Sequence, residues 1–139
     1  MKKVFLDANV IIDLLAERKK WLFPILEILE YAKSENISLY CSIISLPTVD
    51  YIMERQEKIS HDIVIQKVDF FISLCEPILA DKQIAKSALK SSFKDFEDAM
   101  QYFSAVSEGC DVIITRNKKD FLESKIQVLE PQEFLDEFL

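Results

Sequence analysis

The stretch from Phe93 to Phe121 constrains the fold most, because helix, strand and turn signals follow one another there without a gap. Apolar residues recur at positions i, i+3, i+4 and i+7 from Ala99 to Val106, which predicts an amphipathic helix. Asp95 is suited to cap its start, and Gly109, the only glycine, stands where helices commonly end in a left-handed residue. The run from Val112 to Ile114 then predicts a strand buried on both faces, as in a parallel sheet.

Short apolar runs alternate with helical patterns along the rest of the chain. The expected strands cover residues 3–6, 37–42, 76–79, 112–114 and 126–129. The expected helices begin near Asn9, Leu22, Ser45, Ser60, Asp81, Asp95 and Pro131, with Ser45 and Ser60 as caps. This alternation indicates an α/β fold with a mostly parallel central sheet flanked by helices. Because there is no repeat, low-complexity tract or linker, we expect a single domain over residues 1–139.

Composition limits the compartment and the possible partners. Charges interrupt every apolar run well before the ~18 residues of a membrane span, and no signal peptide is recognisable. Three cysteines, each in an apolar stretch, suggest buried reduced thiols. We therefore expect a cytoplasmic protein without a membrane contact. The formal net charge of −7 argues against a protein that coats nucleic acid, but it is compatible with a nuclease that recruits cations.

The scarcity of glycine and histidine excludes several chemistries. One glycine cannot build a phosphate-binding loop or a dinucleotide fingerprint. The only histidine, His61, stands at an expected helix start far in sequence from the acidic stretch, so histidine-based catalysis is disfavoured. An aspartyl-phosphate enzyme would need a second Asp two residues after Asp7, where this chain has Asn9.

Carboxylate chemistry remains. Asp7 ends the first strand, and strand carboxyl ends border the ligand crevice in open α/β sheets. Asp98 at a helix start can converge with it, together with Asn117 or Asp120 after a later strand. Oxygen ligands without His or Cys suit Mg²⁺ or Mn²⁺. The residues alone leave open whether Asp98 is a ligand or only part of a helix cap.

Other acidic residues have simpler interpretations. Asp95 is explained as a cap, and Glu97 as a solvated partner of the helix dipole. Asp13, Asp50 and Asp62 fall on helical patterns, so we expect them to be exposed to solvent.

Three segments in order resemble the PIN-domain family. They are residues 4–15 (VFLDANVIIDLL), 93–102 (FKDFEDAMQY) and 114–121 (ITRNKKDF), and the resemblance continues to residues 128–135. The chain is similar to the small bacterial members of VapC type, which are ribonuclease toxins. The resemblance therefore implies a three-layer fold, a carboxylate cluster that binds Mg²⁺ or Mn²⁺, cleavage of RNA, and an antitoxin partner.

The resemblance also implies roles for individual residues. Asp7 and Asp98 match two acids of the family motif and would hold the metal. Asn117 and Asp120 match the last polar position and would position water or a second cation. Asn9, beside the first acid, and Arg116 are candidate substrate contacts. Arg116 would bind a phosphate, with pairing to an acid as its structural alternative.

The chain departs from the family at the second acid. Thr48 stands where the usual Glu follows a Ser/Thr-Leu step, and Asp50 lies about 200° around the helix from it. The rival interpretation is therefore a PIN-fold module that has weakened catalysis and binds RNA or protein, and a DNA-directed nuclease is a third.

Trp21, Leu22 and Phe23 predict an interface. Adjacent helical residues point in different directions, so one core cannot easily bury all three. We expect a homodimer or an antitoxin complex on the helices of the first half, unless a neighbouring helix covers these side chains.

Overall fold

The computed structural model describes all residues, 1–139, and has a five-stranded sheet at its centre. The strands are β1 (Lys3–Leu6), β2 (Ser38–Ser42), β3 (Glu76–Ile78), β4 (Val112–Ile114) and β5 (Gln127–Leu129). Their order is β3-β2-β1-β4-β5, and every neighbouring pair is parallel. The predicted α/β class and all five predicted strands are confirmed, with ends that differ by a residue at most.

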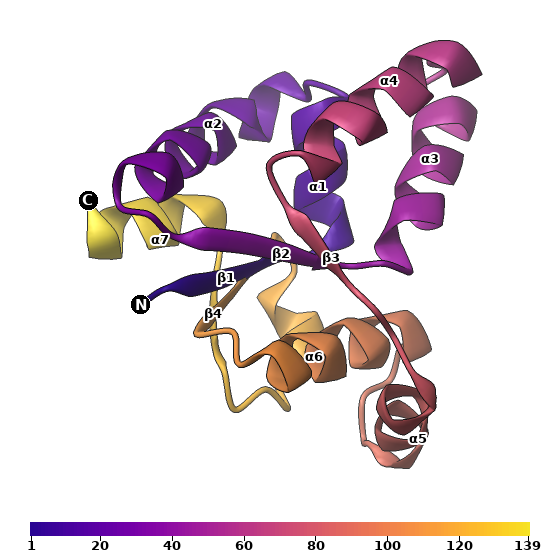
Figure 1. Cartoon of the computed structure of the whole chain (residues 1–139), viewed down its shortest axis with the longest axis vertical. Coiled ribbons are helices and arrows are strands. Elements are labelled where there is room, and N and C mark those ends of the chain that lie inside the picture. Colours follow the sequence, from indigo (N-terminus) through magenta and orange to yellow (C-terminus); the bar gives the residue numbers. More distant parts are fainter.

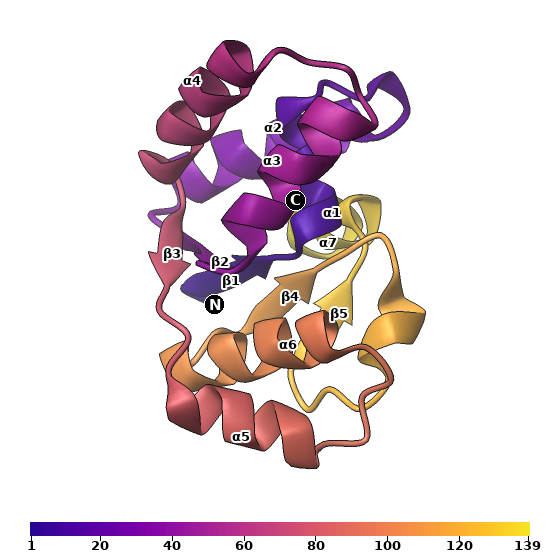
Figure 2. The same ribbon diagram turned by 90° about the vertical axis from the view of Figure 1, so that its right-hand side faces the viewer.

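Helices cover both faces of the sheet and make three layers (Figure 1). One face carries α1 (Ala8–Leu15), α2 (Lys19–Ser34), α3 (Ser45–Arg55), α4 (His61–Ile72) and α7 (Pro131–Phe138). The other carries α5 (Lys82–Lys90) and α6 (Phe96–Glu108), and a short 3-10 helix, η1 (Lys118–Phe121), follows β4. Figure 2 shows α5 as the outermost element beneath α6. None of these helices combines the length and apolar character needed to cross a membrane.

The central strand β1 divides the core between the two faces. Val4 and Leu6 belong to a cluster of 22 buried residues under the larger helical layer. Phe5 points the other way and packs with Tyr102 and Ile113 in a second cluster. This period of two is the geometry of an extended strand, and all three side chains are at most 1% exposed. Because β1 is enclosed on both faces and both edges, the residue that follows it enters a dry environment.

Helix α6 is buried more widely than its apolar stripe predicts. Ala99 and Tyr102 are buried as expected, whereas Val106 is 45% exposed. Gln101 and Ser104 are almost fully buried although they are polar. The difference arises because α6 lies between the sheet and α5, so that two of its sides are covered.

The ends of α6 follow the expected chemistry. The Asp95 carboxylate accepts a hydrogen bond of 2.9 Å from the Asp98 backbone N–H, and Gly109 has a φ of 73°. Ser60 occupies the N-cap position of α4 as expected, although its side chain makes no cap bond, whereas the expected cap Ser45 is a buried residue inside α3. The three cysteines are free and buried, as predicted.

Replacement of Gly109 by Ala is expected to lower the free energy of unfolding by about 1 kcal/mol, since non-glycine residues are strained in the left-handed region. An added Cβ would meet no atom within 4 Å, so the cost comes from the backbone alone. Urea denaturation at unchanged m-value measures it. Gly109→Asn is the control, because Asn tolerates this conformation better, and equal losses in both variants would contradict the explanation.

Candidate functional site

Asp7 lies at the carboxyl end of β1, in the N-cap position of α1. Its N–H donates to the Ile114 carbonyl at 3.0 Å, which continues the pairing of β1 with β4 beyond the strand. Asp7 is only 4% exposed. Burial raises the pKa of its carboxyl group, while a hydrogen bond from Thr115 opposes that rise. Asp7 therefore stands at the end of the buried strand β1, as predicted from the sequence, and the structure adds that its carboxyl group is desolvated.

Two neighbouring side chains orient the Asp7 carboxylate. The Thr115 hydroxyl donates to Asp7 Oδ2 at 2.7 Å, and the Asn9 amide donates to the same oxygen at 3.1 Å. The Asn9 carbonyl in turn accepts from the Arg116 backbone N–H at 3.3 Å. Asn9 is thus a link between α1 and the exit of β4. Thr115 was not singled out from the sequence, where it was only one polar residue of the exit from the strand.

A second polar contact joins the starts of α1 and α3 to the middle of α6 beside Asp7. Gln101 Oε1 of α6 accepts from the Ala8 backbone N–H at 3.1 Å and from the Ser45 hydroxyl at 3.3 Å. All three residues are buried. Neither Gln101 nor Ser45 was predicted to take part, and the available signal was a polar residue inside the strongly apolar pattern of α6.

Asp98 lies in the first turn of α6 and is partly buried. Burial raises its pKa to about 7, and the negative charge of Asp7 is the next largest cause, followed by those of Asp95, Asp120 and Glu97. The two acids, 91 positions apart in sequence, therefore act on one another electrostatically. The cap of α6 is supplied by Asp95, so the question that the sequence left open is answered against a capping role for Asp98.

Glu97 is not the solvated residue that we expected. Its Oε1 atom is enclosed by the protein and has no hydrogen-bond partner. Its charge contributes to the raised pKa of both Asp7 and Asp98. The prediction failed because position in the first turn of a helix fixes the favourable dipole, but not which way the side chain points.

Asp120 and Asn117 follow β4 as predicted. Asp98, Asp120 and Lys119 line a recess of about 110 Å³ between α6 and η1. Asn117 is the N-cap of η1, and its backbone N–H donates to the Thr115 hydroxyl at 3.0 Å. Asp120 thus borders Asp98, and Asn117 borders the residue that holds Asp7.

Arg116 is engaged by the protein itself. Its guanidinium pairs with Asp13 of α1 and lies 3.9 Å from the centre of the Trp21 ring. Asp13 also accepts from Arg18 at 3.2 Å. Asp13 is 0% exposed, so its predicted exposure is wrong, because two guanidinium groups compensate its buried charge. The structural alternative for Arg116 is present, and a phosphate contact stays a prediction.

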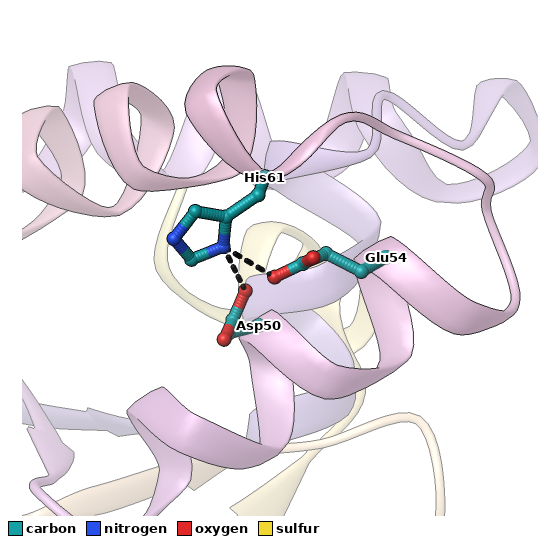
Figure 3. Close-up of side chains that lie close together, drawn as sticks. All are labelled: Asp50, Glu54 and His61. Atoms are coloured by element: carbon teal, nitrogen blue, oxygen red, sulfur yellow. Dashed lines mark hydrogen bonds and ion pairs between the residues drawn. The ribbon is translucent and has the colours of Figure 1, made fainter.

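A separate group of potential metal ligands lies on α3 and α4. Asp50, Glu54 and His61 bring one ligand atom each within 4.8 Å of one another (Figure 3). His61 Nδ1 is 2.8 Å from Glu54 Oε2 and 4.0 Å from Asp50 Oδ1. Its hydrogen bond with Glu54 raises the pKa of His61, which favours the protonated imidazole beside these two acids. Asp50 is half-buried against α4, so its predicted exposure is wrong. Asp62 is exposed as predicted.

The acids at the end of β1 have no such internal compensation. No Lys, Arg or His nitrogen lies within 4.0 Å of a carboxylate oxygen of Asp7, Glu97 or Asp98. The ligand atoms of these three acids do not all lie within 4.8 Å of one another. A hard divalent cation with some of its own waters suits such an all-oxygen set, and its charge would offset the repulsion. The residues present therefore fit Mg²⁺ or Mn²⁺.

The fold and this edge define a class of protein: small parallel α/β domains that gather carboxylates where the central strands end. The chain belongs to the PIN domain family, since the family model described as "PIN domain" matches residues 3–119. The chain is also 29% identical over 140 residues to Ribonuclease VapC1 from Aquifex aeolicus (strain VF5). That alignment covers 97% of this chain and 94% of the relative.

Solved structures share the fold. A DNA-bound VapBC from Salmonella typhimurium matches with a TM-score of 0.72 and 23% identity, over 94% of this chain and 99% of the matched chain. VapBC2 from Rickettsia felis, bound to a promoter DNA fragment, matches with a TM-score of 0.71 and 18% identity. This match covers 92% of this chain and 98% of the matched chain. A toxin–antitoxin complex from Klebsiella pneumoniae matches with a TM-score of 0.66 and 22% identity. This match covers 92% of this chain and 97% of the matched chain.

Asp98→Asn is expected to stabilise the metal-free protein at high pH. Because the folded-state pKa of about 7 lies above the ordinary value of 3.8, proton binding stabilises the fold below about pH 4. That contribution is lost as the pH rises to 7. The Asn variant should therefore be more stable above pH 7 by about 1 kcal/mol, after discounting for solvent screening, and nearly equal at pH 4. Urea denaturation in EDTA across this range measures the difference.

The control is Asp95→Ala. Loss of the cap should lower stability by about 1 kcal/mol at both pH 7 and pH 8. An Asp98→Asn protein that is less stable than wild type at pH 8 would contradict the electrostatic origin.

Proposed function

We propose that this chain is a metal-dependent endoribonuclease and the toxin of a toxin–antitoxin pair, with the activity carried by one domain over residues 1–139. The observation that carries the proposal is the pair Asp7 and Asp98. Each has a raised pKa, the charge of the first raises the pKa of the second, and no cationic side chain neutralises either. Structural acids are normally paired or exposed. Uncompensated acids at the end of parallel strands indicate a cation site.

Asp7 and Asp98 are the proposed ligands of Mg²⁺ or Mn²⁺. Asn9 and Thr115 hold the Asp7 carboxylate in one orientation, because both donate to the same oxygen. The other oxygen is thereby left for the cation. When bound, the cation polarises a phosphoryl oxygen and makes water a stronger nucleophile at neutral pH. The donor set gives no preference between the two ions.

Asn117 and Asp120 have supporting roles in this proposal. Asp120 borders the same recess as Asp98 and can position an attacking water or a second cation. Asn117 holds the Thr115 hydroxyl through its backbone. Arg116 is already paired with Asp13, so a phosphate contact requires its outer guanidinium edge. Asn9 is assigned to orientation of Asp7 rather than to direct contact with substrate.

RNA is the proposed substrate rather than DNA. The reason is the similarity to Ribonuclease VapC1 over 97% of the chain. The rival is a PIN-fold module that binds RNA or protein without cleaving it, and Thr48 favours this rival, because it places no carboxylate at that position of α3.

Purified protein is expected to cleave total RNA in the presence of Mn²⁺ or Mg²⁺ and not in EDTA. Asp7→Asn and Asp98→Asn should each lower the rate more than ~100-fold, since loss of a ligand exceeds the 10–100-fold effect of losing a ligand's hydrogen-bond partner. Gel electrophoresis of RNA measures the cleavage, and single-stranded DNA of matched sequence tests the alternative substrate. RNA binding without metal-dependent cleavage would favour the rival module.

The proposed antitoxin surface is a groove between α1, α2 and α4. The groove has a volume of about 460 Å³, and nine of its twelve lining residues are hydrophobic. Leu26, Phe70 and Leu74 line it and remain exposed, Phe70 to 63%. An amphipathic segment of a partner fits such a groove. The solved VapBC and toxin–antitoxin complexes, which share the fold, support an antitoxin as that partner.

The segment that suggested an interface divides among three places. Leu22 lines this groove, Trp21 is covered by Arg116, and Phe23 is 70% exposed beside a second depression with Tyr31. A homodimer through Phe23 stays a prediction.

Phe70→Glu is expected to weaken binding of the proposed antitoxin at least tenfold, because a charge would be buried against apolar groups. RNA cleavage should be unchanged. Co-purification and inhibition of cleavage measure the two effects. Leu79→Glu is the matched control, since Leu79 is 77% exposed and lies outside the groove. Equal binding by wild type and Phe70→Glu would place the partner elsewhere.

A further inference from the structure

We propose that Glu97 is a third acidic ligand of the metal centre, so that α6 supplies the carboxylate that α3 lacks at Thr48. This inference rests on the proposed metal site of Asp7 and Asp98. It assigns a role to a residue that the sequence pattern alone explains as a solvated helix-dipole partner.

The first observation is the orphaned oxygen. Glu97 Oε1 is enclosed by protein and has no hydrogen-bond partner, and no Lys, Arg or His nitrogen lies within 4.0 Å of the carboxylate. An enclosed anionic oxygen without a partner is costly. The cost is removed when a cation occupies the space that the oxygen faces.

The second observation is where Glu97 lies on its helix. Glu97 and Gln101 are four residues apart, so they lie one above the other on the same face of α6. Gln101 is the residue that accepts from the Ala8 N–H, next to Asp7. Glu97 therefore lies one turn beyond Gln101 on the face that meets the end of β1.

The third observation is that α3 and α6 meet at this edge. The Ser45 hydroxyl in the first turn of α3 donates to Gln101 Oε1 at 3.3 Å. Thr48 lies three residues further along α3, close to one turn away. An acid on α6 and an acid on α3 can thus approach one centre from its two sides. The absence of a carboxylate at Thr48 leaves that centre with one acid fewer, and Glu97 restores the number.

A capping role does not explain Glu97. Asp95 already satisfies the start of α6 by accepting from the Asp98 N–H. The helix dipole favours a negative charge in this turn, but it acts equally on an outward-facing carboxylate, which would keep its hydration. Asp50 Oδ1 is also enclosed without a hydrogen-bond partner, but there the His61 Nδ1 atom lies 4.0 Å away, whereas no such nitrogen lies near Glu97.

The test measures Mn²⁺ binding directly. The affinity of wild type, Glu97→Gln and a Glu97→Gln/Thr48→Glu double variant is measured by isothermal titration calorimetry and by the loss of the free Mn²⁺ electron paramagnetic resonance signal. We expect Glu97→Gln to weaken Mn²⁺ at least tenfold and to slow RNA cleavage in parallel. Thr48→Glu should recover most of both losses, because it returns a carboxylate to the same centre from α3.

Two matched controls locate the effect. Glu108→Gln removes the same charge at the far end of α6 and should leave Mn²⁺ affinity unchanged. Glu54→Gln removes a ligand from the Asp50–Glu54–His61 group and should also leave it unchanged. Circular dichroism confirms that each variant is folded.

The outcomes separate this inference from the proposed function. If Glu97→Gln binds Mn²⁺ and cleaves RNA as well as wild type does, the role of Glu97 is overturned. The roles of Asp7 and Asp98 are then unaffected. No Mn²⁺-dependent cleavage by wild type would overturn the proposed function itself. If Glu97→Gln weakens Mn²⁺ binding and Thr48→Glu does not recover it, Glu97 does not replace the missing α3 acid. The same conclusion follows if Glu108→Gln weakens Mn²⁺ binding as much as Glu97→Gln does.

Discussion

Burial of a carboxylate at the end of the central strand is the constraint on which this structure depends. β1 is paired on both edges and covered on both faces, so Asp7 leaves it into a region from which water is almost excluded. A charge in such a place must be held by hydrogen bonds or by a cation. Thr115 and Asn9 supply the hydrogen bonds, and both bind one oxygen. No cationic side chain compensates the remaining charge, and we propose that a divalent cation does so.

The scaffold around this acid is itself fixed by a second buried charge. Asp13, one and a half turns further along α1, binds Arg116 at the exit of β4 and Arg18 before α2. Trp21 covers the Arg116 guanidinium from the other side. These contacts tie the segment from Asp13 to Trp21 to the exit of β4, where Thr115 donates to Asp7. The two buried acids at the start and in the middle of α1 thus differ. Arginine side chains neutralise Asp13, whereas no cationic side chain pairs with Asp7.

The same physical distinction separates the two acidic groups of the protein. The Asp50–Glu54–His61 group lies on helices and contains its own titratable cation. The Asp7–Glu97–Asp98 group lies where strands end, and it contains none. If proximity of ligand atoms were the only criterion, the Asp50–Glu54–His61 group would be the candidate metal site. The criterion of uncompensated charge favours the Asp7–Glu97–Asp98 group instead. The apolar groove of α1, α2 and α4 is lined by residues other than those of the two acidic groups.

The sequence by itself determined the order of the elements, the parallel sheet, the position of Asp7 at a strand end and both ends of α6. These follow from local rules, namely the period of apolar residues, the chemistry of helix ends and the single glycine. Only the tertiary structure decided which acids are buried. Asp13 and Glu97 have the sequence signature of exposed helical residues, and their burial depends on side chains more than fifteen positions away or on another layer of the fold. Desolvation is a property of everything that surrounds a group in space, so no local pattern of residues can specify it.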